Sequence, residues 1–166
     1  MIDSFKGQYF FLSNFSDSLL TFDGIDYPTV EHYYVAMKVG NSQLIDGKQF
    51  DLMDVREMIS KIPTASKVKK FGRGEIQLRD DWDNIKYDVM YRAVGQKFRR
   101  HEKLKELLLG TGDVELVEGN WWGDIYWGIC DGVGENNLGK ILMTVRSEIL
   151  KEEKENSLET ILKNKE

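Results

Sequence analysis

The chain has 166 residues, which predicts a single domain, and its formal net charge of −5 makes it a poor non-specific binder of DNA. Its single cysteine, Cys130, excludes an internal disulfide framework and an all-cysteine zinc site, and fits a reducing, cytoplasmic compartment. The N-terminus has no export signal and no run of about 18 apolar residues occurs, so we expect neither export nor membrane insertion.

The segment up to Tyr27 is rich in aromatic and turn-forming side chains. Short strands are predicted at 9–12, 19–22 and 25–27. Asp23 and Gly24, between the last two strands, are typical of a tight hairpin turn. The segment therefore predicts a small antiparallel β-ribbon.

Helical spacing dominates after this ribbon. Helices are predicted at 30–38, 52–61, 83–98, 104–109 and 138–149. Thr29 and Asp83 are suitable N-caps for two of them, and Gly110 is suited to end the fourth. The predicted fold class is therefore α+β, a single compact domain over 1–150 that is mostly helical after the ribbon. Residues 151–166 are highly charged and predict a frayed helix or a disordered tail.

The segment 61–74 is locally basic. It holds no acidic residue and five cations, Lys61, Lys67, Lys69, Lys70 and Arg73. A local positive potential of this kind suits a phosphorylated small molecule or one exposed nucleotide better than a long duplex. The alternative interpretation is a solvated basic face of a helix.

Signatures of cofactor and metal sites are not matched. The pattern G-x-G-x-x-G begins at Gly132 but has Asn137 in place of the third glycine, and no strand-turn-helix unit surrounds it. The chain has only two histidines, His32 and His101, which excludes a histidine-rich metal site. We therefore expect no cofactor and no metal.

Two carboxylates have neighbours that suggest chemistry. Glu31 falls in the first turn of a predicted helix, where desolvation raises a carboxyl pKa and the helix N-terminus lowers it, so either an acid or a base results. Asp124 lies in 121–128, which contains three of the four tryptophans. Such a segment could form a pocket for a planar heterocycle. The alternative, a tryptophan-rich corner of the core, is favoured by periodicity.

Several short motifs follow one another along residues 5–150. They lie at 11–15, 27–38, 65–73, 81–83, 90–98, 108–112, 116–118, 123–128 and 136–146. In this order they resemble the NADAR superfamily, which includes the YbiA-like N-glycosidases of riboflavin biosynthesis. The motifs of that family match at Glu31, Trp82 and Asp124. The chain departs from the family pattern at Val35, where glutamine is common, and in an insertion-like stretch at 41–49.

The resemblance implies a mostly helical α+β fold that hydrolyses an N-glycosidic bond to a ribose-phosphate or ADP-ribose. The implied substrate is a phosphorylated ribosyl small molecule such as a riboflavin-pathway intermediate, or else an ADP-ribosylated guanine base. A non-catalytic module that binds ADP-ribose is the rival from another class. An extended nucleic acid is not expected as partner because the net charge is acidic. A membrane is not expected because the chain has no long apolar run.

The reaction places charge on the sugar and on the leaving nitrogen, so it requires carboxylates and a proton donor but no metal. We expect Glu31 and Asp124 as catalytic carboxylates, Asn14 on the ribose, Lys67 and Arg73 on the phosphate, and Trp82 and Trp127 around the heterocycle. The alternative for Trp82 is that it only packs at the start of its helix. A stacking tryptophan must keep one ring face open to its ligand.

Overall fold

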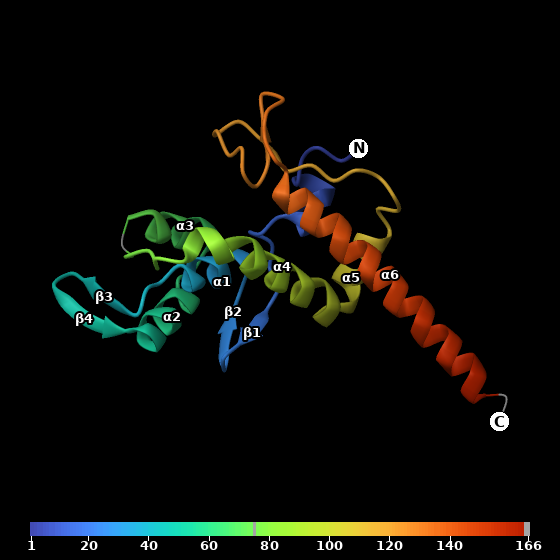
Figure 1. Cartoon of the computed structure of the whole chain (residues 1–166), viewed down its shortest axis with the longest axis horizontal. Helices are drawn as coiled ribbons and strands as arrows, with labels where there is room; N and C mark the ends of the chain where they lie inside the picture. Colours follow the sequence, from blue (N-terminus) through green and yellow to red (C-terminus); the bar gives the residue numbers. More distant parts are fainter. Residues whose placement is uncertain (75, 165–166) are drawn as a thin grey trace. The chain divides into compact units, whose positions relative to one another are not determined.

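The computed structural model describes residues 1–74 and 76–164 (Figure 1). The chain forms two compact units: Ser13–Lys97, and Met1–Leu12 together with the residues from Phe98 onward. Helices and small strand pairs make up both units, so the predicted α+β class is confirmed. No helix in the described ranges has both the length and the hydropathy needed to cross a bilayer.

The unit Ser13–Lys97 begins with the predicted ribbon. Strands β1 (Leu20–Phe22) and β2 (Ile25–Tyr27) pair antiparallel, and Asp23 and Gly24 between them adopt positive φ angles of 51° and 76°. The ribbon is fastened by Gln96, whose side-chain amide exchanges two hydrogen bonds with the backbone of Thr21, at 2.8 and 3.0 Å.

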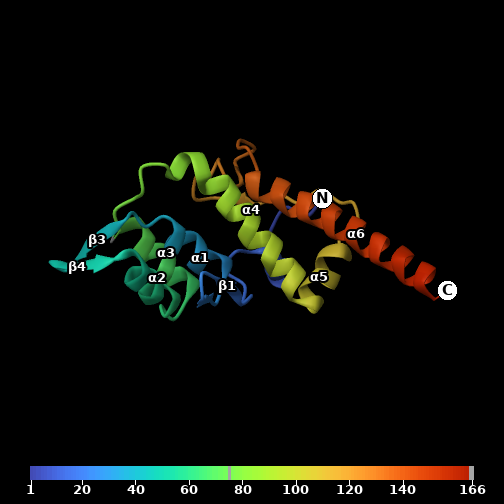
Figure 2. The same cartoon turned by 60° about the horizontal axis from the view of Figure 1, so that its bottom comes forward.

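Three short helices follow in the same unit. They are α1 (Val30–Met37), α2 (Leu52–Ser60) and α3 (Ala65–Gly74). Thr29 is the N-cap of α1, as predicted, and its hydroxyl accepts a hydrogen bond from the His32 amide at 3.3 Å. All residues of α1 are buried, and Figures 1 and 2 show this helix beside α2 and α3.

Helix α3 approaches α1 closely at a glycine. A Cβ at Gly72 would lie 2.8 Å from Cγ1 of Val35, so a larger residue at this position would force the helices apart. Val35 itself is fully buried. The departure from the family pattern at Val35 therefore lies in the packing between α1 and α3.

The stretch 41–49, for which no element was predicted, forms a hairpin. Strands β3 (Ser42–Ile45) and β4 (Lys48–Asp51) pair antiparallel around Asp46 and Gly47, both at positive φ. Gln43 fixes the hairpin to the chain after α3, because its side chain exchanges hydrogen bonds of 2.6 and 2.9 Å with the Gln77 backbone.

The longest helix of this region, α4 (Trp82–Arg100), starts one residue before the position predicted for it. Asp83 was expected as its N-cap but lies in the first turn, where its carboxylate accepts a hydrogen bond from Lys86 at 2.8 Å.

The other unit contains three helices and one small strand pair. They are the 3₁₀-helix η1 (Gly7–Leu12), α5 (Glu102–Leu109), α6 (Asn137–Lys163), and the parallel strands β5 (Gly119–Asn120) and β6 (Ile129–Cys130). The predicted strand at 9–12 is therefore wrong. Gly110 ends α5 as predicted.

Helix α6 continues far into the predicted tail. It remains helical to Lys163, so the helical alternative describes 151–163, while 165–166 lie outside the described residues. Arg99 binds Glu148 and Glu152 on this helix at 2.9 and 2.7 Å. Beyond these ion pairs the last turns are exposed.

Candidate active site

Glu31 is held in place by the start of α1 and by a turn from the N-terminal part of its unit. Glu31 is only 7% exposed to solvent. Its backbone N–H donates a hydrogen bond to the Asn14 carbonyl oxygen at 3.1 Å. A carboxylate withdrawn from water in this way acts strongly on neighbouring charges, because the local dielectric is low.

Lys38 follows Glu31 by seven residues, so both lie on one face of α1. Burial lowers the pKa of the Lys38 ammonium, and the Glu31 carboxylate opposes that effect. Three other cations lower the pKa of Lys38 further: Lys69, Arg73 and Lys86. Lys38 therefore lies near the Glu31 carboxylate and near three further cations, and we call Lys38, Lys69, Arg73 and Lys86 the cation cluster.

The cation cluster contains Arg73, which was predicted as a phosphate ligand, but not Lys67. Lys69 and Arg73 are four residues apart on α3 and share a face, whereas Lys67 lies roughly 200° around the helix axis from Lys69. The Lys67 side chain is exposed, and it stays a predicted ligand. The spacing of four between Lys69 and Arg73 was a signal from which the pair was predictable.

Trp82 lies at the start of α4 and packs against α1. Its ring meets that of Tyr34 edge to face, with centroids 5.0 Å apart, and the Lys38 Nζ lies 5.9 Å from the Trp82 ring centroid. Trp82 is 5% exposed. The ring is covered by its neighbours in this structure, which favours the alternative that Trp82 packs at the start of its helix. Its contact with the heterocycle stays a prediction.

Asn14 contributes to the same unit in two ways. Its carbonyl oxygen accepts the Glu31 amide, and its side-chain amide donates to the Met90 sulfur at 3.5 Å. The side chain is half-buried. Its contact with the ribose stays a prediction.

Asp124 and Trp127 belong to the other unit, in the loop between β5 and β6. One Asp124 carboxylate oxygen, Oδ1, accepts hydrogen bonds from the backbone amides of Trp127 and Tyr126, at 2.9 and 3.2 Å. Asn120 binds the Asp124 backbone at both its amide and its carbonyl. The Asp124 carboxylate thus shapes this loop, and its catalytic role stays a prediction.

This tryptophan-rich loop is fixed by the start of α6. Backbone amides of residues 135–138 donate to carbonyl oxygens of residues 125–128. Trp127 is half-buried and packs edge to face on Tyr126, at 4.8 Å between centroids. Trp121 and Trp122 are 79% and 43% exposed. The alternative of a tryptophan-rich core corner is therefore wrong for these two.

Two substitutions separate the roles of Asp124. Asp124→Asn keeps an oxygen that accepts the amides of Tyr126 and Trp127, so we expect a near-wild-type melting temperature with impaired turnover. Asp124→Ala removes that acceptor and should lower the free energy of unfolding by about 1–3 kcal/mol as well. Thermal melts and assays of released base measure both effects. Full turnover of Asp124→Asn would confine Asp124 to shaping the loop.

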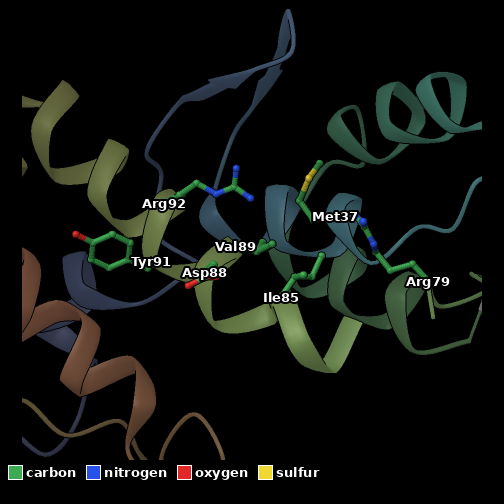
Figure 3. Close-up of a pocket in the computed structure, with 7 residues that line it drawn as sticks. All are labelled: Met37, Arg79, Ile85, Asp88, Val89, Tyr91 and Arg92. Carbon is green, nitrogen blue, oxygen red and sulfur yellow. The ribbon is translucent and has the colours of Figure 1, made fainter. Parts of the chain in front are cut away.

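A separate hollow of about 470 Å³ lies along α4 (Figure 3). It is lined by Met37, Arg79, Ile85, Asp88, Val89, Tyr91 and Arg92. Figure 3 shows the two arginines on different sides of the apolar Met37, Ile85 and Val89. The Arg79 guanidinium is bound by Asp81, at 2.6 and 3.0 Å. No residue predicted for the site lines this hollow.

Comparison with known proteins defines the class of this protein. Residues 3–150 match the NADAR domain. The chain is 39% identical over 140 residues to an N-glycosidase of Nostoc punctiforme, covering 82% of this chain and 83% of that protein. It is 37% identical over 141 residues to a riboflavin biosynthesis protein of Vibrio vulnificus, covering 84% of this chain but 35% of that protein.

A solved structure agrees with these relatives. The NMR structure of the E. coli protein YbiA has a TM-score of 0.73 at 33% identity, over 92% of this chain and 89% of that one. The extent of these similarities places the chain in the N-glycosidase class of hydrolases. The chain belongs to the NADAR family.

Proposed function

We propose that this N-glycosidase hydrolyses the C1′–N bond of a phosphorylated ribosyl heterocycle of the riboflavin-pathway type. The observation that carries the proposal is the buried Glu31 carboxylate near Lys38, a member of the cation cluster. The relative named for riboflavin biosynthesis supports the choice of substrate class.

Glu31 supplies the negative charge that the reaction needs. Breaking the C1′–N bond builds positive charge on the ribosyl ring, and a carboxylate near C1′ stabilises that charge or takes a proton from the attacking water. The effect is largest where water is excluded, since the charge is then poorly screened. Glu31 is 7% exposed, so it meets this condition of exclusion from water.

The cation cluster supplies the complementary charge for a phosphate. The Arg73 guanidinium offers a planar pair of donors for two phosphate oxygens, and the lysine ammoniums act as point charges. The cluster also offsets the repulsion between a dianionic phosphate and the Glu31 carboxylate. A neutral nucleoside gains nothing from these cations, so the cluster favours a phosphorylated substrate.

The test uses two substrates with the purified protein. One is an amino-pyrimidine ribose phosphate, and the other is an oligonucleotide that carries ADP-ribosylated guanine. We expect release of the free base from the first. Release from the oligonucleotide alone would establish the alternative substrate, and binding of ADP-ribose without release of any base would indicate a non-catalytic module.

Substitutions on α3 test where the phosphate binds. We expect Lys69→Ala and Arg73→Ala to raise KM by roughly tenfold at low ionic strength, because each loses a charge-assisted hydrogen bond. The increase should shrink as salt rises, since both sites are accessible to counterions. Steady-state kinetics at two salt concentrations measure this.

Lys67→Ala, on the same helix, decides between the two predicted positions of the phosphate. It removes one cation from the opposite part of the helix surface, so KM stays nearly unchanged if the phosphate binds at Lys69 and Arg73. An increase in KM with Lys67→Ala that equals the increase with Lys69→Ala would move the phosphate to the exposed face of α3.

A further inference from the structure

Lys97 is a buried lysine in the last part of α4. It is 1% exposed, and it is among the largest fully buried side chains of the chain. Its Nζ donates hydrogen bonds to the Ser13 carbonyl oxygen at 2.9 Å and to the Ser16 hydroxyl at 2.7 Å. Both partners belong to one short turn, 81 to 84 residues away in the sequence.

The turn that Lys97 binds is closed by its own hydrogen bonds. The Ser16 amide and hydroxyl both donate to the Ser13 carbonyl oxygen, at 3.2 and 3.0 Å. The Phe15 amide donates to the Ser13 hydroxyl at 3.1 Å. Residues 13–16 therefore form one hydrogen-bonded turn, and the Lys97 ammonium binds it at Ser13 and at Ser16.

The same turn touches the proposed site twice. The Asn14 carbonyl oxygen accepts the amide of Glu31 at 3.1 Å. The Lys69 Nζ lies 5.5 Å from the centroid of the Phe15 ring, within the range of a cation–π contact. A displacement of the turn would therefore shift the first turn of α1, which carries Glu31, and one member of the cation cluster.

A buried ammonium at this position is unfavourable for the free energy of folding. Burial destabilises the charged form and lowers the pKa of Lys97 to about 7. A methionine of similar length would fill the space without that cost. The polar end of Lys97 is therefore explained by the hydrogen bonds that it makes to the turn.

We propose that Lys97 is a positioning residue for catalysis. It holds the turn 13–16 in place, and this turn holds the backbone of Glu31 in place. The proposal rests on the proposed function, in which the Glu31 carboxylate acts on the substrate. Lys97 touches no substrate in this role.

The experiment compares Lys97→Met with Gln96→Met. Gln96 is the neighbouring residue on α4, and its side chain makes two hydrogen bonds to the β1 backbone at Thr21. Gln96→Met therefore removes two hydrogen bonds, as Lys97→Met does, but these bonds have no link to Glu31. Well below the melting temperature, we expect Lys97→Met to lower kcat at least tenfold with KM within about threefold. Gln96→Met should leave kcat within about twofold.

A second readout needs no substrate. Hydrogen exchange at the Glu31 amide reports its bond to the Asn14 carbonyl, and we expect Lys97→Met to speed this exchange at least tenfold relative to amides within α4. If the proposed substrate is wrong, this measurement still decides whether Lys97 fixes the turn.

Ser16→Ala is the milder variant if Lys97→Met fails to fold. It removes one Nζ partner and should speed exchange at the Glu31 amide and lower kcat, each by less than Lys97→Met would. The proposal is overturned if the lysine variant, or Ser16→Ala in its place, changes kcat and Glu31 exchange no more than Gln96→Met does.

Discussion

Glu31→Gln is expected to lower turnover by ~10²–10⁴-fold while the protein stays folded and still binds substrate. Glutamine has nearly the same shape as glutamate, so the buried position is filled, but the negative charge and the titratable group are lost. The assay is release of free base under single-turnover conditions, with binding followed by titration of the inactive variant.

Two further measurements test whether this loss of turnover is specific to Glu31. Glu57→Gln removes an exposed carboxylate on α2 that pairs with Lys61 at 3.5 Å, and should leave turnover unchanged. Because Glu31 raises the pKa of Lys38 against the effect of burial, Glu31→Gln should also lower the pKa of that ammonium. Turnover of Glu31→Gln within a few-fold of wild type would remove Glu31 from the mechanism.

The elements that were predictable carry strong local signals. Thr29 before an apolar run fixes the start of α1, and Gly110 marks the end of α5. Asp23 and Gly24 accept the positive φ angles that a tight turn between β1 and β2 requires. In each case a single residue has a conformational preference that agrees with its surroundings, so tertiary contacts do not override it.

Two of the errors in the predicted elements have different causes. The aromatic run 9–12 has the composition of a strand, but Gly7 at φ 55° starts a 3₁₀-helix there, and strand propensity depends on a partner strand. The hairpin β3–β4 was missed although Asp46-Gly47 is a strong turn signal. Most residues of its strands are polar, so the alternation of apolar and polar residues that indicates a strand is weak there.

The candidate site was predictable only in part. Glu31 follows from a family motif and Arg73 from the basic stretch 61–74, and the spacing of Glu31 and Lys38 places them on one helix face. The role proposed for Lys97 depends on contacts with residues more than 80 positions away, which no local pattern encodes. The covering of Trp82 by Tyr34 is likewise a tertiary contact.

The covered ring of Trp82 leads to the second large effect. Trp82→Ala should lower the free energy of unfolding by ~3–5 kcal/mol, because it empties a buried volume beside Tyr34. For a chain of this size that loss corresponds to a melting temperature lower by roughly 6–20 °C. Thermal and urea unfolding measure the change.

Controls separate packing from ligand stacking at Trp82. Trp82→Phe retains an aromatic edge for Tyr34 and should lose less stability than alanine. Trp121→Ala removes a tryptophan that is 79% exposed, so its free energy of unfolding should stay within about 0.5 kcal/mol of wild type. If Trp82→Ala instead melts like wild type and loses substrate affinity, the ring must open in solution and stack on the heterocycle. A large loss of stability with Trp82→Ala alone makes Trp82 a packing residue, which supports the site by holding α4 against Tyr34 and the Lys38 ammonium.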